Sequence, residues 1–289
     1  MKKYSTLEFF AAALLVASPV AAQELKTANF LDNYLYGYRI NPSVTPYGTS
    51  GFFGMGASNI SLASESDFGI STFLFPQADG PIVTGLNKAV PASQFPGDMK
   101  EINRLHEQLN ENLLSFGFTG GKKGSYNTFE VNLVTDNTFQ VPRSLFEAFK
   151  SGSPTGIYDV QGINFTTSNY IEAAYSHSNR KKNLAIGWRI KGLVGIAKAA
   201  ANVDMKIVSN SEQMSVSSQG TLEAAAAPLS IGIRDGYYDF SNIGLNTEAI
   251  RPAGFGVALD LGMSYYLLKD KLVLGAAVRN VGAMKWTTN

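Results

Sequence analysis

Large apolar residues alternate with small or polar residues along much of the chain, which is the period-2 pattern of β-strands whose two faces differ. The longest alternating run covers residues 255–267. It exceeds the roughly 5–6 residues of a common soluble strand and is long enough to cross a bilayer at a tilt. Further runs lie at 114–118, 129–133, 170–175, 184–191, 202–208 and 272–278. The pattern predicts an all-β protein.

Alternation by itself fits both a soluble β-sandwich and a membrane β-barrel. The strand length and an opposite face rich in Gly, Ala and Ser favour a transmembrane antiparallel β-barrel, closed or incomplete, because lipid requires every backbone group to be paired within the structure. The apolar face then contacts lipid and the other face lines the lumen. The candidate lumenal polar residues are Glu172, Arg189, Lys191, Asp204, Lys206, Asp260 and Arg279. A soluble secreted β-sandwich is the alternative fold.

Two roles are open for these lumenal charges. They could form a binding site or a proton relay, or they could be cross-strand ion pairs that fill a narrow barrel. The second arrangement is the commoner one.

The first residues have the features of a secretory signal peptide. Lys2 and Lys3 precede a short apolar stretch, and small residues up to Ala22 form a cleavage site. We therefore expect residues 1–22 to be removed and the protein to reach the outer membrane.

The rest of the chain divides into a strap and a barrel domain. Residues 23–50 are aromatic and irregular, and we expect them to form a strap or plug. Residues 51–289 form the expected barrel domain, with two helical insertions. The first helix, near 98–110, is predicted from apolar residues at helical spacing after a capping box. The second, near 142–150, is predicted from a similar apolar stripe that begins at a proline.

Composition excludes several kinds of function. The 24 basic and 23 acidic residues nearly cancel, which argues against a nucleic-acid partner. The chain has no cysteine, and therefore no disulfide and no thiol nucleophile. Its two histidines are too few for a multi-histidine metal centre. We expect no catalytic, cofactor-binding or metal-binding residue, and no enzyme.

Neither histidine stands in a specific chemical pattern. His106 lies on the first expected helix without a ligand partner four residues later, so it reads as a boundary residue. His177 shares a strand face with Asn179, as in a barrel phospholipase, but period 2 turns Ser176 to the other face. A serine from a neighbouring strand keeps the lipase alternative open. Gly54 begins a glycine pair that lacks the third glycine of a dinucleotide fingerprint and is expected to permit bending or close packing.

Several segments together carry a resemblance to a known family. Residues 30–43 read FLDNYLYGYRINPS, and residues 170–177 read YIEAAYSH. Further segments follow the same order at 68–76, 103–106, 141–149 and 254–265. This set resembles an uncharacterised family of Bacteroidota outer-membrane proteins, domain of unknown function 5723.

The resemblance implies an outer-membrane β-barrel with an N-terminal strap. The family is distantly similar to fatty-acid-transporter-like barrels, whose N-terminus forms a hatch in the lumen. It defines no functional residue. Its members continue past the position of Trp286, so the resemblance also implies a C-terminally truncated member.

We expect a barrel that passes or binds small or hydrophobic compounds. Its partners would be outer-membrane lipid and a small hydrophobic ligand, with no cofactor. A structural or interaction barrel in a surface or secretion assembly is the alternative. The sequence identifies no protein partner.

Overall fold

The computed structural model describes residues 34–46, 49–77, 80–121, 124–151, 156–210, 213–226, 229–234, 237–245 and 251–287. The expected signal peptide and the first part of the expected strap lie outside these ranges.

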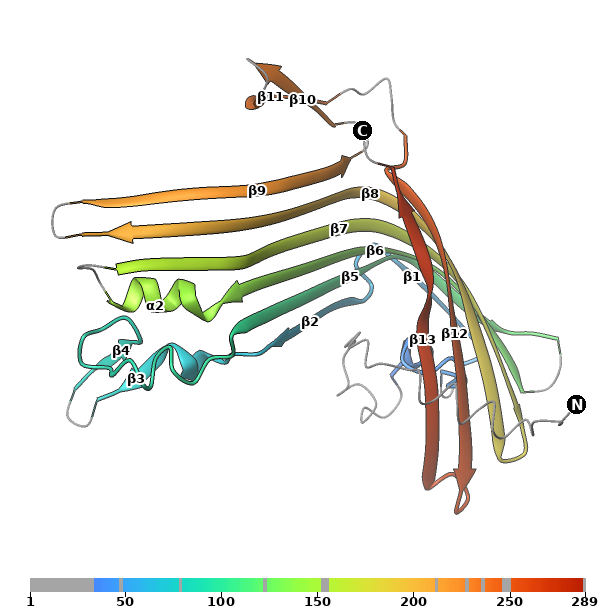
Figure 1. Cartoon of the computed structure of the whole chain (residues 1–289). Helices are drawn as coiled ribbons and strands as arrows, with labels where there is room; N and C mark the ends of the chain where they lie inside the picture. Colours follow the sequence, from blue (N-terminus) through green and yellow to red (C-terminus); the bar gives the residue numbers. More distant parts are fainter. Residues whose placement is uncertain are drawn as a thin grey trace, which may run out of the picture.

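One antiparallel sheet of nine strands dominates the structure (Figure 1). Its strands are β1 (Gly51–Met55), β2 (Ile60–Ser66), β5 (Ile102–Thr119), β6 (Ser125–Pro142), β7 (Gly156–Lys181), β8 (Leu184–Ser209), β9 (Met214–Ala226), β12 (Gly254–Leu267) and β13 (Leu272–Trp286). The smaller elements are the hairpins β3 (Leu74–Pro76) with β4 (Ile82–Thr84) and β10 (Leu229–Arg234) with β11 (Tyr237–Leu245), the 3-10 turns η2 (Gly37–Arg39) and η3 (Ile70–Thr72), and helix α2 (Arg143–Ser151). The prediction of an all-β protein is confirmed.

The strand order is β1-β5-β6-β7-β8-β12-β13, with β2 also paired to β5 and β9 also paired to β8. Thus β5 and β8 each change partner partway along their length. Among the described residues, β13 pairs only with β12, and β1 and β2 pair only with β5. The nine described strands therefore form an open sheet, and they do not close into a barrel.

The long strands bend and divide the sheet into two limbs (Figure 1). Register shifts occur where β5 passes Asn112, and where β7 and β8 pass Tyr170 and Gly195. An extra residue in one strand of a pair bends that strand, which accounts for the change of direction. We call the limb with β1, β12, β13 and the adjoining parts of β5–β8 the strap limb. We call the limb with β2, β9 and the remaining parts of β5–β8 the arm.

From here on, the strap means residues 34–46, a described part of the segment expected to form a strap, and it includes η2. The strap limb is named after it. The strap packs against one face of this limb, the inner face, within the curve of the sheet (Figure 1, blue). A Cβ atom on Gly187 would lie 2.0 Å from the carbonyl oxygen of Pro42, and one on Gly262 would lie 2.1 Å from Oδ1 of Asn41. The strap therefore reaches the sheet backbone at positions where only glycine fits.

The buried apolar cluster lies at the far end of the arm. Val90, Phe95 and Met99 are buried there, and Phe73 and Phe146 pack against them. Phe146 comes from α2, which shows why that helix is amphipathic. The rings of Phe75 and Phe146 make edge contacts with Phe95, and the ring of Phe73 packs against it at a tilt, which stabilises this end of the arm.

Of the two expected helices, only the second forms. Helix α2 covers the expected 142–150 region, and Arg143 pairs with Glu147 one turn later at 2.9 Å. The prediction of a helix near 98–110 is wrong, because residues from Ile102 onward belong to β5. Strand β5 is paired on both sides, and its polar residues Asn110 and Asn112 alternate onto the inner face. Sheet pairing therefore overrides the helical spacing of the apolar residues. No helix in the described part of the chain is long and apolar enough to cross a membrane.

Candidate functional site

Burial in the strap limb is the reverse of that in a water-soluble sheet. On β12 the polar residues Asp260 and Ser264 are buried, whereas Phe255, Leu261 and Met263 are exposed. Phe255 is 61% exposed and Asp260 is 0% exposed. Strand β8 repeats the arrangement, with Arg189 and Lys191 buried and Ile186 and Ile190 exposed. The period-2 pattern thus separates the two faces as the sequence predicts, with the charged face turned inward.

A network of charged side chains lies on this inner face. Glu130 of β6 bonds Arg39 of the strap at 2.7 Å and also contacts Arg189 of β8. Arg189 bonds Glu172 of β7 at 2.6 Å. Lys191 of β8 lies 2.8 Å from Asp260 of β12 and 3.7 Å from Glu172. The network therefore links four strands and the strap.

The network is balanced in charge. Its three carboxylates are those of Glu130, Glu172 and Asp260, and its three cations are those of Arg39, Arg189 and Lys191. All six side chains are at most 7% exposed. Buried charges need this kind of mutual pairing, because an unpaired charge away from water is strongly destabilising.

The strap also makes hydrogen bonds to the sheet besides its ion pair. The Tyr38 hydroxyl donates to Glu130 at 3.0 Å, and Nη2 of Arg39 donates to Asn132 at 2.8 Å. Asn41 and Ser43 bond the hydroxyl of Ser264 on β12. The strap is thus attached to the inner face by polar contacts to β6 and β12, on both sides of the charge network.

The structure separates the seven sequence-predicted polar residues into two groups. Glu172, Arg189, Lys191 and Asp260 meet in the network, and Arg279 lies beside them, with its guanidinium donating to the Arg39 carbonyl at 3.3 Å. Two others lie on the arm, away from the network. Asp204 accepts a hydrogen bond from the backbone of Gly162 at 3.0 Å, and Lys206 is exposed.

Sequence reasoning missed two members of the network. Glu130 lies between the apolar residues Phe129 and Val131, so the period-2 rule that identified the other residues also places it on the polar face. Arg39 belongs to an irregular segment, and no periodic signal marks it. Only the fold brings it to Glu130.

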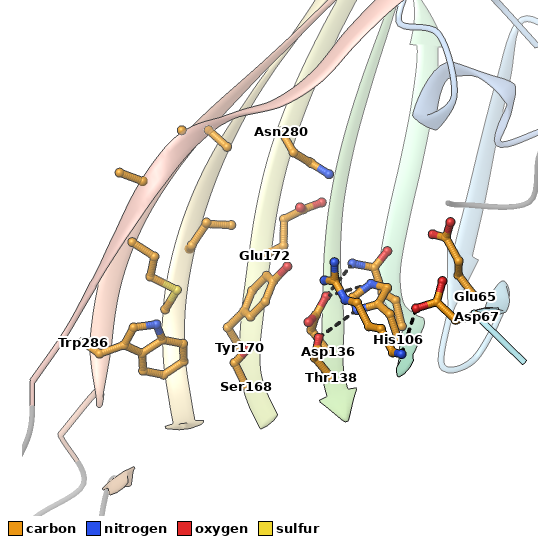
Figure 2. Close-up of a pocket in the computed structure, with 17 residues that line it drawn as sticks. Glu65, Asp67, His106, Asp136, Thr138, Ser168, Tyr170, Glu172, Asn280 and Trp286 are labelled. Atoms are coloured by element: carbon orange, nitrogen blue, oxygen red, sulfur yellow. Dashed lines mark hydrogen bonds and ion pairs between the residues drawn. The ribbon is translucent and has the colours of Figure 1, made fainter. Parts of the chain in front are cut away.

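A cavity of about 860 Å³ lies on the inner face. Figure 2 shows that its two walls differ. The polar wall carries acidic residues, His106 and Thr138 from the arm parts of β2, β5 and β6. The other wall, with Trp286 at its end, is mostly apolar and comes from β8, β12 and β13. Its apolar members are Leu193, Ala258, Ala283, Met284 and Trp286. Glu172 and Asn280 join the cavity to the charge network.

His106 lies in this cavity, and the prediction that it is a boundary residue on a helix is wrong. It sits on β5, where Nδ1 is 3.1 Å from the Thr138 hydroxyl and Nε2 is 3.6 Å from the Asp136 carboxylate. Asp67, at the rim, bonds Lys100 at 2.7 Å. This bond, together with the backbone N–H of Arg104, lowers the pKa of Asp67.

His177 lies on the opposite, outer face, as period 2 predicts. Its Nδ1 is 2.8 Å from Oδ1 of Asn127, and its ring lies beside Trp188. Ser176 and Ser178 are buried on the inner face. Ser125 of the neighbouring strand accepts a hydrogen bond from Asn179 at 2.8 Å. No hydrogen bond joins a serine to His177 within the described ranges, so the assembled nucleophile and base of a lipase are not present there.

No group of three potential His, Asp or Glu metal ligands occurs in the described part of the chain. The Gly54 backbone is packed closely, because a Cβ atom there would lie 2.7 Å from the Ser58 hydroxyl and 3.0 Å from that of Tyr36. This agrees with close packing rather than nucleotide binding at the glycine pair.

The fold and the site define an all-β protein with one large antiparallel sheet, a polar inner face and an apolar outer face. Residues 42–289 match the Family of unknown function (DUF5723), and the chain belongs to this family. No curated protein and no solved structure matches the chain.

Proposed function

We propose that the protein contributes the wall of an outer-membrane β-barrel, with the outer face of the strap limb in lipid. The inner face lines a lumen that is partly filled by the strap and that binds small molecules. The observation that carries the proposal is the reversed burial of the strap limb. A continuous exposed apolar surface is unfavourable in water but favourable in hydrocarbon.

The height of the apolar face supports the proposal. Its exposed apolar residues extend from Phe255 to Tyr265 on β12 and from Leu184 to Ile190 on β8. A strand crosses a bilayer with about 9–11 residues at a tilt of roughly 45°. The face on β12 therefore has the length of one crossing.

The connections support an orientation for this barrel wall. The ends of β5 and β6, of β7 and β8, and of β12 and β13 that are joined by short connections lie at the end of the strap limb that is farther from the arm. Outer-membrane barrels have short turns on the periplasmic side and longer connections outside. We therefore assign the turns to the periplasm and the arm to the cell exterior.

The proposal also includes partners for the free sheet edges. Within hydrocarbon, unpaired backbone groups on an open edge cost several kcal/mol each. Further strands must therefore pair with β13 and with the edge formed by β1.

Cell fractionation followed by electrophoresis with and without boiling tests the membrane assignment. We expect the protein in the outer-membrane fraction, with a faster band before boiling because a closed barrel resists the detergent. A soluble periplasmic protein without a heat shift would contradict the proposal and favour the secreted sandwich.

The cavity favours small-molecule binding over a purely structural role. Its volume lies within the range of about 300–1,000 Å³ that ligand sites occupy. Uptake or binding assays with a deletion strain test this role. Unchanged uptake together with stable co-purification of partner proteins would favour the structural alternative.

A further inference from the structure

We propose that the cavity selects ligands that combine one cationic group with an apolar body. This inference rests on the proposed small-molecule binding and specifies its substrate class. It is carried by the two chemically different walls of the cavity and by the charges that surround each of them.

The polar wall has a surplus of negative charge. It carries the carboxylates of Glu65, Asp67 and Asp136 and one guanidinium, that of Arg104. Lys100 pairs with Asp67 from outside the cavity lining. Three carboxylates against these two cations leave one net negative charge when His106 is neutral, which matches a single cationic group.

Asp136 and Glu65 are the acids best placed to receive that group. Asp136 has only weak partners, since Nε2 of His106 lies at 3.6 Å and Nε2 of Gln108 at 3.3 Å. Glu65 makes no ion pair with another described residue, and it lies across β5 from Asp136 on the same inner face. An ammonium at this wall would gain the hydrogen bonds that the two carboxylates lack.

None of the described residues that line the opposite wall is cationic. Leu193, Met284 and Trp286 give it an apolar surface, and the one carboxylate between the walls, Glu172, is already bonded to Arg189. Trp286 offers an indole face, which attracts cations and packs against apolar groups. A fatty-acid-like anion would meet one guanidinium, that of Arg104, beside the three carboxylates of the polar wall, so it should bind more weakly than a cation of the same size.

Three probes with the same apolar body test this selectivity: 4-phenylbutylamine, 4-phenylbutyrate and 4-phenylbutanol. The chain has only two tryptophans, so Trp188→Phe leaves Trp286 as the fluorescent reporter in the cavity. Titration of the purified, detergent-solubilised full chain should show that the amine binds about ten-fold more tightly than the butyrate, with the alcohol between them.

Matched variants locate the selectivity. Glu65→Gln with Asp136→Asn should reduce the preference for the amine to about two-fold or less. Glu107→Gln with Glu111→Gln is the control, because it removes two carboxylates from the other face of β5 and should keep the preference. Met284→Asn should weaken all three probes together, since it changes the apolar wall only.

The outcomes separate this inference from the proposed function. Equal binding of the three probes would overturn cation selectivity and leave small-molecule binding intact. No binding of any probe would overturn both. Retained selectivity in the Glu65→Gln, Asp136→Asn variant would also overturn the inference, provided that its heat-shifted band shows that it is folded.

Discussion

The strap limb and the arm share the same long strands but differ in how polar their outer faces are. In the strap limb, one cross-strand row on the outer face runs through Phe116, Phe129 and Tyr175. In the arm, the corresponding row on the same face runs through Glu107, Asn137 and Thr167. The next outer row of the arm, Leu105, Phe139 and Phe165, is apolar again. The outer face is therefore uniformly apolar along this part of the strap limb, and on the arm polar and apolar rows follow one another.

The inner faces of the two limbs differ in how their charged side chains are buried. The inner face of the strap limb holds six buried, mutually paired charges. On the arm, the sequence-predicted Lys206 is exposed to solvent. Charge pairing is therefore buried in the strap limb, whereas the ion pairs described on the arm are partly exposed and should contribute less to stability. Substitutions of the same kind in the two limbs should consequently have different effects.

The largest difference is expected when a cation is removed from each limb. Arg189→Met leaves Glu130, Glu172 and Asp260 with only two cationic partners, which should cost about 3–5 kcal/mol. Lys206→Met should change stability by less than about 0.5 kcal/mol. The temperature at which the fast-migrating band disappears measures both. Equal effects would contradict the assignment of the network to the folded core.

A charge placed on each outer face gives the next largest difference. Leu261→Arg puts a cation into the proposed lipid-facing surface, at a cost of about 2–4 kcal/mol if the site lies near the bilayer centre. Thr167→Arg places the same side chain on the arm and should have little effect. Urea unfolding in liposomes compares the two. If Leu261→Arg is as stable as Thr167→Arg, the outer face does not contact lipid.

A third comparison concerns the contact between the strap and the sheet. Gly262→Val should displace the strap, because its Cβ would overlap Asn41. The control is Gly192→Val, where the nearest heavy atom to an added Cβ is 3.9 Å away. Ser43→Cys introduces the only cysteine at a fully buried strap position. Maleimide should label it about ten-fold faster with Gly262→Val, which corresponds to about 1.4 kcal/mol of opening. Equal labelling in the two glycine variants would show that the strap does not depend on this contact.

The smallest effect is expected at the exposed pair of Lys100 and Asp67 on the arm. The bond to Lys100 lowers the pKa of Asp67, so it contributes stability above the ordinary aspartate pKa and loses it as pH falls through the lowered value. Lys100→Ala should therefore cost less than about 1 kcal/mol at neutral pH. The difference should vanish well below about pH 3.9, where the unfolded carboxylate is already protonated. A difference that persists at acidic pH would show that Lys100 acts through something other than this ion pair.

The sequence predicts the alternating strands well because the side-chain period is set by the backbone itself. Residues 184–191 and 255–267 lie on β8 and β12 with the expected faces. The sequence predicts secondary structure less well where contacts with neighbouring strands decide which element forms. Near 98–110 the apolar residues have helical spacing, but pairing of β5 with strands on both sides makes the segment a strand.

The site shows the same division. Period 2 brings Glu172, Arg189, Lys191 and Asp260 to one face and could have included Glu130 by the same rule. It cannot distinguish these residues from Asp204 and Lys206, because the bulges that separate the two limbs leave no clear signal in the sequence. The role of Arg39 in the network is recognised only when the strap is placed on the sheet. The cavity, too, is visible only in the fold, because its walls come from strands that are distant in the chain.

Quenching of the two tryptophans tests the central claim most directly. Trp188 lies on the outer face of the strap limb, and Trp286 lies in the inner cavity. In liposomes with brominated acyl chains, Trp286→Phe protein should lose most of the Trp188 fluorescence to the lipid and little of it to aqueous acrylamide. Trp188→Phe protein should show the reverse for Trp286. If lipid bromine leaves Trp188 unquenched while acrylamide quenches it, the outer face is in water and the membrane account is wrong.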